Sequence, residues 1–153
     1  MRILKLSCLV AVVCLLTGCG ERETPVRTNT ATGENVTLRT GRAIAPPTNL
    51  PNFAPLYPGA RIESVLEGNG SAGERGAMVA FQTGDPPDRV AAFYRTRLDA
   101  SGLSERSDVN MNGSVILAAG SKGDIDRGVQ ITITPATDAP GSYVTLTYNL
   151  GDG

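Results

Sequence analysis

The chain contains no histidine and no tryptophan, and its three cysteines all lie within the first 19 of its 153 residues. Without histidine, it lacks the usual general base at neutral pH and the commonest metal ligand in proteins. Aromatic residues make up only 5% of the chain, so a core must be built mainly from aliphatic side chains. Cys8 and Cys14 lie in an apolar stretch typical of a cleaved signal, so the mature chain keeps Cys19 alone and cannot form an internal disulfide.

An excess of positive charge is also missing. Removal of residues 1–18 takes away Arg2 and Lys5 and leaves 12 of the 14 basic side chains against 15 acidic ones, a balance of −3. Proteins that bind nucleic acids need a basic surface. The sequence therefore predicts no nucleic-acid partner.

The N-terminus has the layout of a secretory signal. Arg2 and Lys5 precede an apolar run of 11 residues, from Leu6 to Leu16, that only Ser7 interrupts. A helix needs about 20 apolar residues to cross a bilayer, so this run is too short to span it stably. A short positive region followed by such a run is typical of an exported protein.

The run ends in Leu16-Thr17-Gly18-Cys19, which resembles the lipobox of bacterial lipoproteins. The resemblance implies that residues 1–18 are removed as a signal peptide and that Cys19 receives diacylglycerol and a further acyl group such as palmitate. Several acyl chains anchor a protein stably, whereas one chain binds only marginally. Gly20 stands where an Asp often retains lipoproteins at the inner membrane, so the resemblance favours the periplasmic face of the outer membrane.

Residues 19–52 are predicted to form a flexible tether that starts at the lipid-bearing Cys19. Thr, Arg, Asn, Gly and Pro dominate from Glu21 to Asn52, and this composition buries too little apolar surface to offset the entropy of ordering. A coil of about 32 residues reaches roughly 30 Å. Val36-Thr37-Leu38 is the exception, because it could add a short edge strand.

The pattern changes at Phe53, and we assign residues 53–153 to one small domain. Arg61 to Leu66 and Ala77 to Thr83 alternate as strands do. Asp85 is a candidate N-cap for a helix that holds Pro86 and Pro87 in its first turn. Val90, Phe93, Tyr94, Arg97 and Leu98 follow helical spacing and form one stripe. Four of them are apolar or aromatic, and the aliphatic stem of Arg97 can lie along them.

Four strands are expected after the helix. Leu103 to Met111 and Ser114 to Ala119 meet at Asn112-Gly113, a strong hairpin signal. Two later segments alternate cleanly, with these residues on their apolar faces: Val129, Ile131 and Ile133, then Val144, Leu146, Tyr148 and Leu150. The order ββα followed by strands predicts an α+β domain of two layers, one helix on a mostly antiparallel sheet of about five or six strands.

Three parts of this domain resemble a small domain found in many bacterial envelope proteins. They are a YPGA turn at Tyr57-Pro58-Gly59-Ala60, a strand end at Phe81-Gln82-Thr83, and a helix with the pattern V-x-x-F-Y at Val90, Phe93 and Tyr94. That domain has no assigned activity. The resemblance therefore implies a fold and an envelope location but no reaction.

Three short motifs are interpreted as turns. Gly68 to Gly73 matches G-x-G-x-x-G, but a dinucleotide site needs a helix to open at that loop, and a strand is expected instead. Asp108 to Gly113 and Asp124 to Gly128 resemble the start of a calcium loop, but Ala119 stands where the first of them needs a bidentate Glu. We predict no cofactor, and whether the two acidic turns bind an ion is left open.

Candidate catalytic groups are few. Ser121 lies beside Lys122, the only lysine of the mature chain, but this Gly-flanked turn is expected to be solvated. Glu63 and Glu67 share a strand face and could form a pair of carboxylates. We predict no catalytic, cofactor-binding or metal-binding residues, so Cys19 is the one assigned site.

The sequence thus predicts a non-enzymatic, lipid-anchored accessory or binding domain, with the membrane as one partner through Cys19 and an envelope protein or glycan as another. The outward positions of the last strands are small and neutral, which suits a polar contact, although threonine is also a good strand former: Gln130, Thr132, Thr134, Thr145 and Thr147. The alternative is a small metal-dependent or carboxylate-based envelope hydrolase. A deep pocket lined by Glu63, Glu67 or Asp124 with convergent polar groups would favour it.

Overall fold

The computed structural model describes residues 24–29, 35–69, 75–122 and 124–151. The predicted signal peptide and Cys19 lie outside the described residues. The elements are, in chain order, β1 (Thr24–Asn29), β2 (Asn35–Thr40), β3 (Arg61–Asn69), β4 (Arg75–Thr83), α1 (Pro87–Asp99), β5 (Glu105–Met111), β6 (Ser114–Ser121), β7 (Asp124–Pro135) and β8 (Ser142–Leu150).

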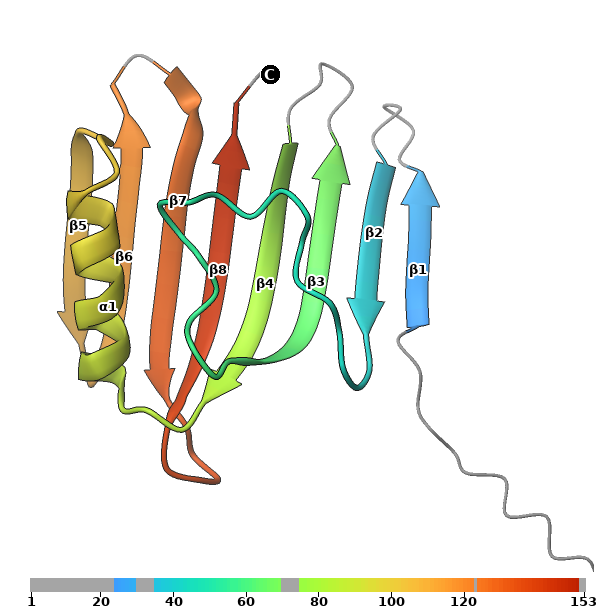
Figure 1. Ribbon diagram of the computed structural model, residues 1–153. Helices are drawn as coiled ribbons and strands as arrows, with labels where there is room; N and C mark the ends of the chain where they lie inside the picture. Colours follow the sequence, from blue (N-terminus) through green and yellow to red (C-terminus); the bar gives the residue numbers. More distant parts are fainter. Residues whose placement is uncertain (1–23, 30–34, 70–74, 123, 152–153) are drawn as a thin grey trace, which may run out of the picture.

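All eight strands form one antiparallel sheet, in the order β1-β2-β3-β4-β8-β7-β6-β5 (Figure 1). Strands β1–β4 make one meander and β5–β8 make another, and the pairing of β4 with β8 joins the two halves. Helix α1 lies in the connection between them. The predicted fold class, a two-layer α+β domain with five or six strands, is therefore wrong: the domain is mainly an eight-stranded antiparallel sheet with one short helix.

The two strands that the prediction lacked are β1 and β2, which lie inside the range assigned to the flexible tether. Thr24 to Thr28 are exposed, because β1 forms one end of the sheet, so this strand has no need of apolar residues. The expected edge strand at Val36-Thr37-Leu38 is part of β2, which lies between β1 and β3 rather than at the edge. The structure thus extends the sheet into the expected tether.

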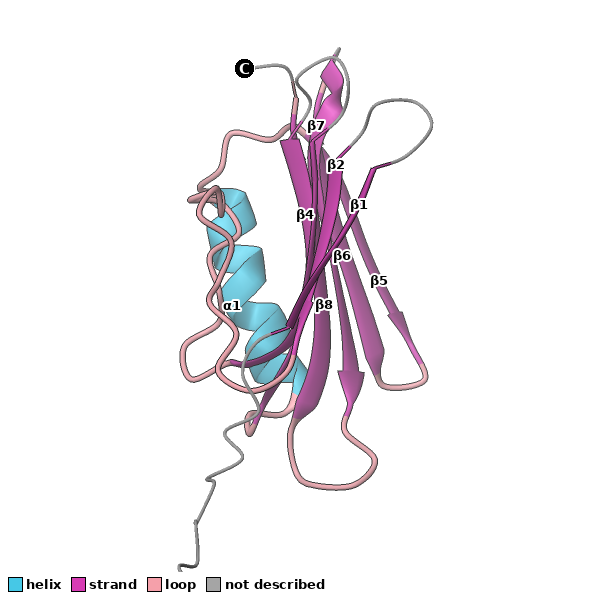
Figure 2. Cartoon of the chain, turned by 90° about the vertical axis from the view of Figure 1, so that its right-hand side faces the viewer, coloured by secondary structure: helices cyan, strands magenta, loops and turns pink. Residues whose placement is uncertain are grey.

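One face of the sheet is covered, by α1 and by the segment 41–60, which we call the covering segment (Figure 2). A helix is about 10 Å wide and strands lie about 4.8 Å apart, so α1 covers only two or three strands, and it contacts β6 and β7. The covering segment packs Ile44, Ala54 and Tyr57 into the rest of this core. Strand residues buried beneath them include Val79, Phe81, Leu117, Ile131 and Leu146.

The opposite side of the sheet, which we call the open face, carries the alternate residues of every strand and no helix (Figure 2). The five outward positions expected from the alternation lie there, since their neighbours Ile131, Ile133, Val144 and Leu146 are buried on the covered face: Gln130, Thr132, Thr134, Thr145 and Thr147. Within the described ranges, no helix is both long enough and apolar enough to cross a bilayer.

Two local predictions were tested at turns. The hairpin at Asn112-Gly113 is confirmed, because both residues have positive φ (52° and 80°) as a type I′ turn requires. The N-cap prediction for Asp85 is wrong: Pro86 occupies the N-cap without a side-chain cap, and the helix begins at Pro87. The Asp85 carboxylate instead accepts a hydrogen bond from Tyr57 Oη (2.7 Å), which holds the pKa of Asp85 below its usual value.

Three aromatic residues of the envelope-domain resemblance, Tyr57, Phe93 and Tyr94, form one cluster. The ring of Phe93 packs edge-on against Tyr57 (centroids 5.0 Å apart) and against Tyr94 (5.1 Å). The buried Tyr94 hydroxyl donates a hydrogen bond to the Pro55 carbonyl at 3.1 Å. The YPGA turn and the V-x-x-F-Y helix therefore fasten the covering segment to α1, which is a structural role.

Candidate functional site: an arginine-lined pocket

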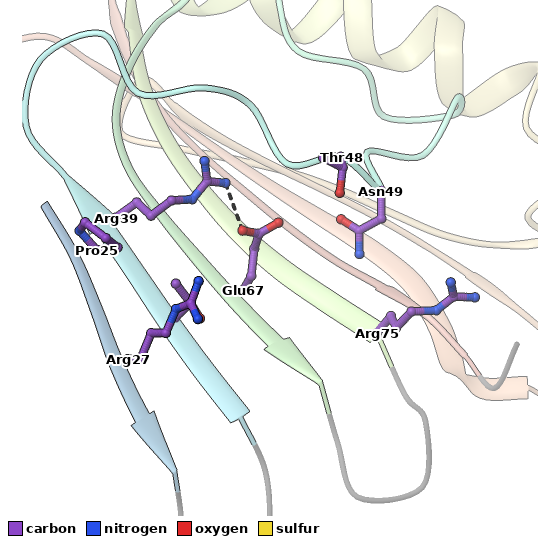
Figure 3. A pocket seen from close by; sticks show the side chains of 8 residues that line it. Pro25, Arg27, Arg39, Thr48, Asn49, Glu67 and Arg75 are labelled. Carbon is purple, nitrogen blue, oxygen red and sulfur yellow. Dashed lines mark hydrogen bonds and ion pairs between the residues drawn. The ribbon is translucent and has the colours of Figure 1, made fainter. Parts of the chain in front are cut away.

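A pocket of about 640 Å³ opens on the covered face at the β1 end of the sheet, beyond the reach of α1 (Figure 3). This volume lies within the roughly 300–1,000 Å³ usual for ligand sites. Strands β1–β4 supply its floor and the covering segment supplies its far wall. The lining residues are Pro25 and Arg27, Thr37 and Arg39, Glu67, Arg75, and Thr48 with Asn49.

The strand register brings the floor of the pocket together. Arg27 is paired with Thr37, and Thr37 is paired with Glu67, so the three side chains stand in one row across β1, β2 and β3. Paired residues of antiparallel strands point to the same face. This row lies on the covered face, because Glu67 is also paired with the buried Ala77 of β4.

Arg39 and Glu67 form the centre of the site (Figure 3). Arg39 Nη2 lies 2.8 Å from Glu67 Oε2, and Arg39 Nη1 donates to the Ala45 carbonyl at 2.9 Å. The two side chains are only 15% and 28% exposed. Arg39 therefore links β2 to β3 and to the covering segment. Glu67 is the only carboxylate among the described residues that line the pocket, and it is already paired with Arg39.

Asn49 is held in the opposite wall by a residue distant in sequence. Tyr148 Oη donates to Asn49 Oδ1 at 2.8 Å, and Tyr148 is almost fully buried. Burial raises the pKa of Tyr148 to about 12, with a further contribution from the negative charge of Glu67. Tyr148 engages the Asn49 oxygen, and the amide N–H groups of Asn49 are the donors that it can offer to the pocket.

The sum of these groups favours an anion. Arg39 and Glu67 neutralise each other, and the guanidinium groups of Arg27 and Arg75 add two positive charges to the lining. The wall adds the Thr48 hydroxyl and the Asn49 amide, both of which can donate hydrogen bonds. Guanidinium groups bind carboxylates and phosphates through paired, charge-assisted hydrogen bonds. The pocket can therefore hold a carboxylate or phosphate group.

The two glutamates considered as a carboxylate pair are not brought together in this pocket. A β-bulge follows Ile62, and Glu63 is exposed and lies 3.7 Å from Arg61 rather than among the lining residues. Glu67 does line the pocket, paired with Arg39. The single described carboxylate there differs from the two-carboxylate arrangement that the hydrolase alternative requires.

The other sequence motifs lie away from the pocket. Both oxygens of Asp108 accept hydrogen bonds from Arg95, at 2.7 and 3.0 Å, which lowers the pKa of Asp108. Lys122 is exposed in its turn, and strand β4 rather than a helix follows the glycine-rich loop, of which residues 70–74 lie outside the described part.

The side chains of Asp124 and Asp126 also lie outside what the structure describes. Among the side chains that it does describe, no three His, Cys, Asp or Glu residues come together as a metal site would need.

Sequence reasoning missed most of the pocket, because six of its eight lining residues fall within the range assigned to the tether. Only the alternation at Val36-Thr37-Leu38 hinted at a strand there. Arg27, Arg39 and Arg75 are far apart in sequence, and nothing local marks them as neighbours. Their proximity follows from the pairing of β1 with β2, which the polar sequence did not reveal.

Comparison with known proteins gives one match. The family model described as START domain-like matches residues 62–141, a range that runs from β3 through α1 and β7 to the residue before β8 and includes Glu67 and Arg75 of the pocket. No curated protein and no solved structure matches the chain. The matched range is 80 residues, more than half of the 153. The chain belongs to the START domain-like family.

Proposed function

We propose that this protein is a lipid-anchored binding domain of the cell envelope that holds an anionic ligand in the arginine-lined pocket. Membership of a START domain-like family fits a ligand-binding domain. The lipobox resemblance at Leu16-Thr17-Gly18-Cys19 supports an anchor on Cys19 and a position on the periplasmic face of the outer membrane. The observation that carries the proposal is the pair of guanidinium groups, Arg27 and Arg75, beside a neutralised Arg39–Glu67 pair.

The proposed role is binding without catalysis. Binding an anion through arginines requires no general base. Glu67, the carboxylate that lines the pocket among the described residues, is already engaged by Arg39. A carboxylate-based hydrolase would need a second acid near Glu67, and the nearest candidate from the sequence, Glu63, is paired with Arg61 outside the pocket. Glu67 does line a pocket, which is one feature that the hydrolase alternative expected, but Arg39 engages its carboxylate and no second described acid lies beside it, so the site supports binding better.

The binding proposal is tested with a double variant, Arg27→Gln and Arg75→Gln, and a matched control, Arg61→Gln. Arg61 is an exposed arginine of the same sheet that does not line the pocket. Two probes are titrated by calorimetry into the purified protein: inorganic phosphate and a short-chain phosphatidylglycerol. We expect the double variant to bind at least tenfold more weakly than the wild type and the control, because two charge-assisted contacts are lost.

The two probes separate the sources of the ligand. Binding of phosphate alone would indicate a soluble anion, and preferential binding of phosphatidylglycerol would indicate a lipid headgroup. Equal affinity of the double variant, the control and the wild type for both probes would contradict an anion site in this pocket.

The anchor is tested separately by labelling cells with a clickable fatty acid. We expect the wild type to carry the label and the Cys19→Ser variant to lack it and to leave the membrane or persist as the uncleaved precursor. Equal labelling of the two proteins would refute lipidation at Cys19, whatever the outcome at the pocket.

A further inference from the structure

The large apolar side chains that are exposed gather on the open face of the sheet. Among the described residues they are Val26, Leu38, Leu66, Met78, Val109 and Met111, between 37% and 59% exposed. The first four form a continuous row, since Val26 is paired with Leu38, Leu38 with Leu66, and Leu66 with Met78. Four neighbouring strands thus present one apolar stripe to the outside.

The same face lacks charge over two full rows. The stripe continues across the sheet through Thr147, Gln130, Ala118 and Ser107. The next row consists of Thr24, Thr40, Ser64, Ala80, Thr145, Thr132, Ile116 and Val109. None of these sixteen residues is charged, although 19% of the chain is. The central part of a protein interface is depleted of charge in the same way.

Of the charges on the two edge strands, Glu105 lies on the open face, paired with Gly120 outside the two central rows, and the following three point to the other face. Arg27 of β1 is paired with Thr37 in the pocket row, and Arg106 and Asp108 of β5 are paired with the buried Ala119 and Leu117. Solvated sheets and edges usually carry charged side chains that discourage association. Here the open face carries none in its two central rows, so nothing there opposes contact with another neutral sheet.

The area of the face is large enough for a stable interface between two copies. Eight strands about 4.8 Å apart span roughly 38 Å, and seven residues along a strand span about 23 Å, which gives on the order of 900 Å². A standard interface buries about 800 Å² on each partner. The apolar half of the face, about 450 Å², would fall short, so the whole face must take part.

We infer that two copies of this chain pack their open faces against each other. The two neutral central rows offer no charge pattern by which a charged partner would be recognised, whereas a second copy supplies a face of the same shape and polarity, with Glu105 and Arg61 outside those rows. Aligned sheets pack about 10 Å apart with their strands about 30° from parallel. A twofold axis perpendicular to the strands would set the row of Val26, Leu38, Leu66 and Met78 against the same row of the other copy.

The inference is tested by crosslinking the full chain in its own membranes. All three natural cysteines lie in residues 1–19, so Leu66→Cys introduces the only thiol of the folded domain, in the middle of the stripe. A bismaleimide with a spacer of about 10 Å matches the distance between packed sheets. The control Thr96→Cys places an exposed thiol on α1, on the covered side. The parent protein reports any reaction of the natural cysteines.

We expect Leu66→Cys to give a band at twice the mass of the uncrosslinked membrane form, and Thr96→Cys and the parent to give none. Equal crosslinking of the two variants, or none of Leu66→Cys, would overturn the inference. So would a crosslinked band at another mass, which would indicate a different protein on this face. Protection of Leu66→Cys from a water-soluble maleimide without a dimer would place the face against lipid and would also overturn it.

A second measurement separates loss of association from loss of folding. Leu38→Lys with Met78→Lys puts charge at two exposed positions of the stripe, so we expect an unchanged thermal unfolding curve and at least a tenfold weaker self-association by sedimentation in detergent. Unchanged association in a folded variant would contradict packing through this face.

Discussion

Removal of a single hydroxyl group, in Tyr148→Phe, tests how the wall of the pocket is held. Tyr148 Oη donates to Asn49 Oδ1 at 2.8 Å across 99 positions of the sequence. Tyr148 is 2% exposed and Asn49 is half-buried, so water cannot readily replace the lost donor. The phenylalanine ring fills the same space in the core. The variant therefore isolates one hydrogen bond between β8 and the covering segment.

The expected cost of Tyr148→Phe follows from the acceptor that it leaves behind. A neutral hydrogen bond contributes about 0.5–1.5 kcal/mol, and an acceptor left without a partner in a part-buried site adds a desolvation cost, so we expect a loss of about 1–2 kcal/mol. For a domain of this size, that corresponds to a fall of roughly 3–6 °C in the melting temperature. We also expect weaker binding of phosphate, because the Asn49 amide is no longer oriented toward the pocket.

The assay is urea unfolding of the purified protein in detergent, with Asn49→Ala and the double variant completing a cycle. In the Asn49→Ala background, Tyr148→Phe should cost less than about 0.5 kcal/mol, because the bond is already absent. A loss in Tyr148→Phe that persists unchanged in that background would refute the hydrogen bond as its cause.

The pH dependence gives an independent check on Tyr148. Its folded pKa of about 12 exceeds the value of about 10 expected in the unfolded chain. The neutral phenol is favoured in the folded state, so the stability that this shift contributes is complete below pH 10 and is lost as the pH rises from 10 to 12. Wild type should therefore lose its advantage over Tyr148→Phe across this range. A constant difference from pH 8 to 11 would contradict the assignment.

Three further predictions concern the fold, each measured as the free energy of unfolding. Gly141→Ala should lower it by more than about 3 kcal/mol, or prevent folding, because the new Cβ would lie 2.1 Å from the Thr83 carbonyl oxygen at a φ of 131°; a stable variant would show that this turn can shift. Ile131→Ala should cost about 3–4 kcal/mol at a fully buried site, and a loss under 1 kcal/mol would place Ile131 outside the core. Asp108→Asn should cost less than about 1 kcal/mol, falling further at high salt, since the bridge to Arg95 is about half exposed; a larger loss, or one insensitive to salt, would contradict this.

The sequence predicted the elements that alternate between a buried and a solvated face. Val129, Ile131 and Ile133 mark β7 because their face lies under α1, and Asn112-Gly113 marks a hairpin because few residue pairs adopt positive φ twice. Six strands and the helix were found in this way. The fold class was nevertheless wrong, because β1 and β2 were not counted.

Those two strands escaped prediction for a physical reason. At the end of a sheet, beyond the helix, a strand buries little surface, and its covered side here lines a polar pocket through Arg27, Thr37 and Arg39. The apolar alternation that identifies a strand is therefore replaced by arginines and threonines. The site and the missed strands have the same origin: the feature that makes the pocket polar also removes the signal for the strands that build it.

The position of β1 has a consequence for where the pocket works. Thr24, the first residue of β1, follows Cys19 by five residues, which span at most about 18 Å even when fully extended. If Cys19 is in the membrane, as we propose, a short linker holds β1 close to the bilayer. Pro25 and Arg27, which line the pocket, belong to this strand. The arginine at the β1 end of the pocket would then be held near the bilayer surface, where lipid phosphates are anions that the pocket could meet.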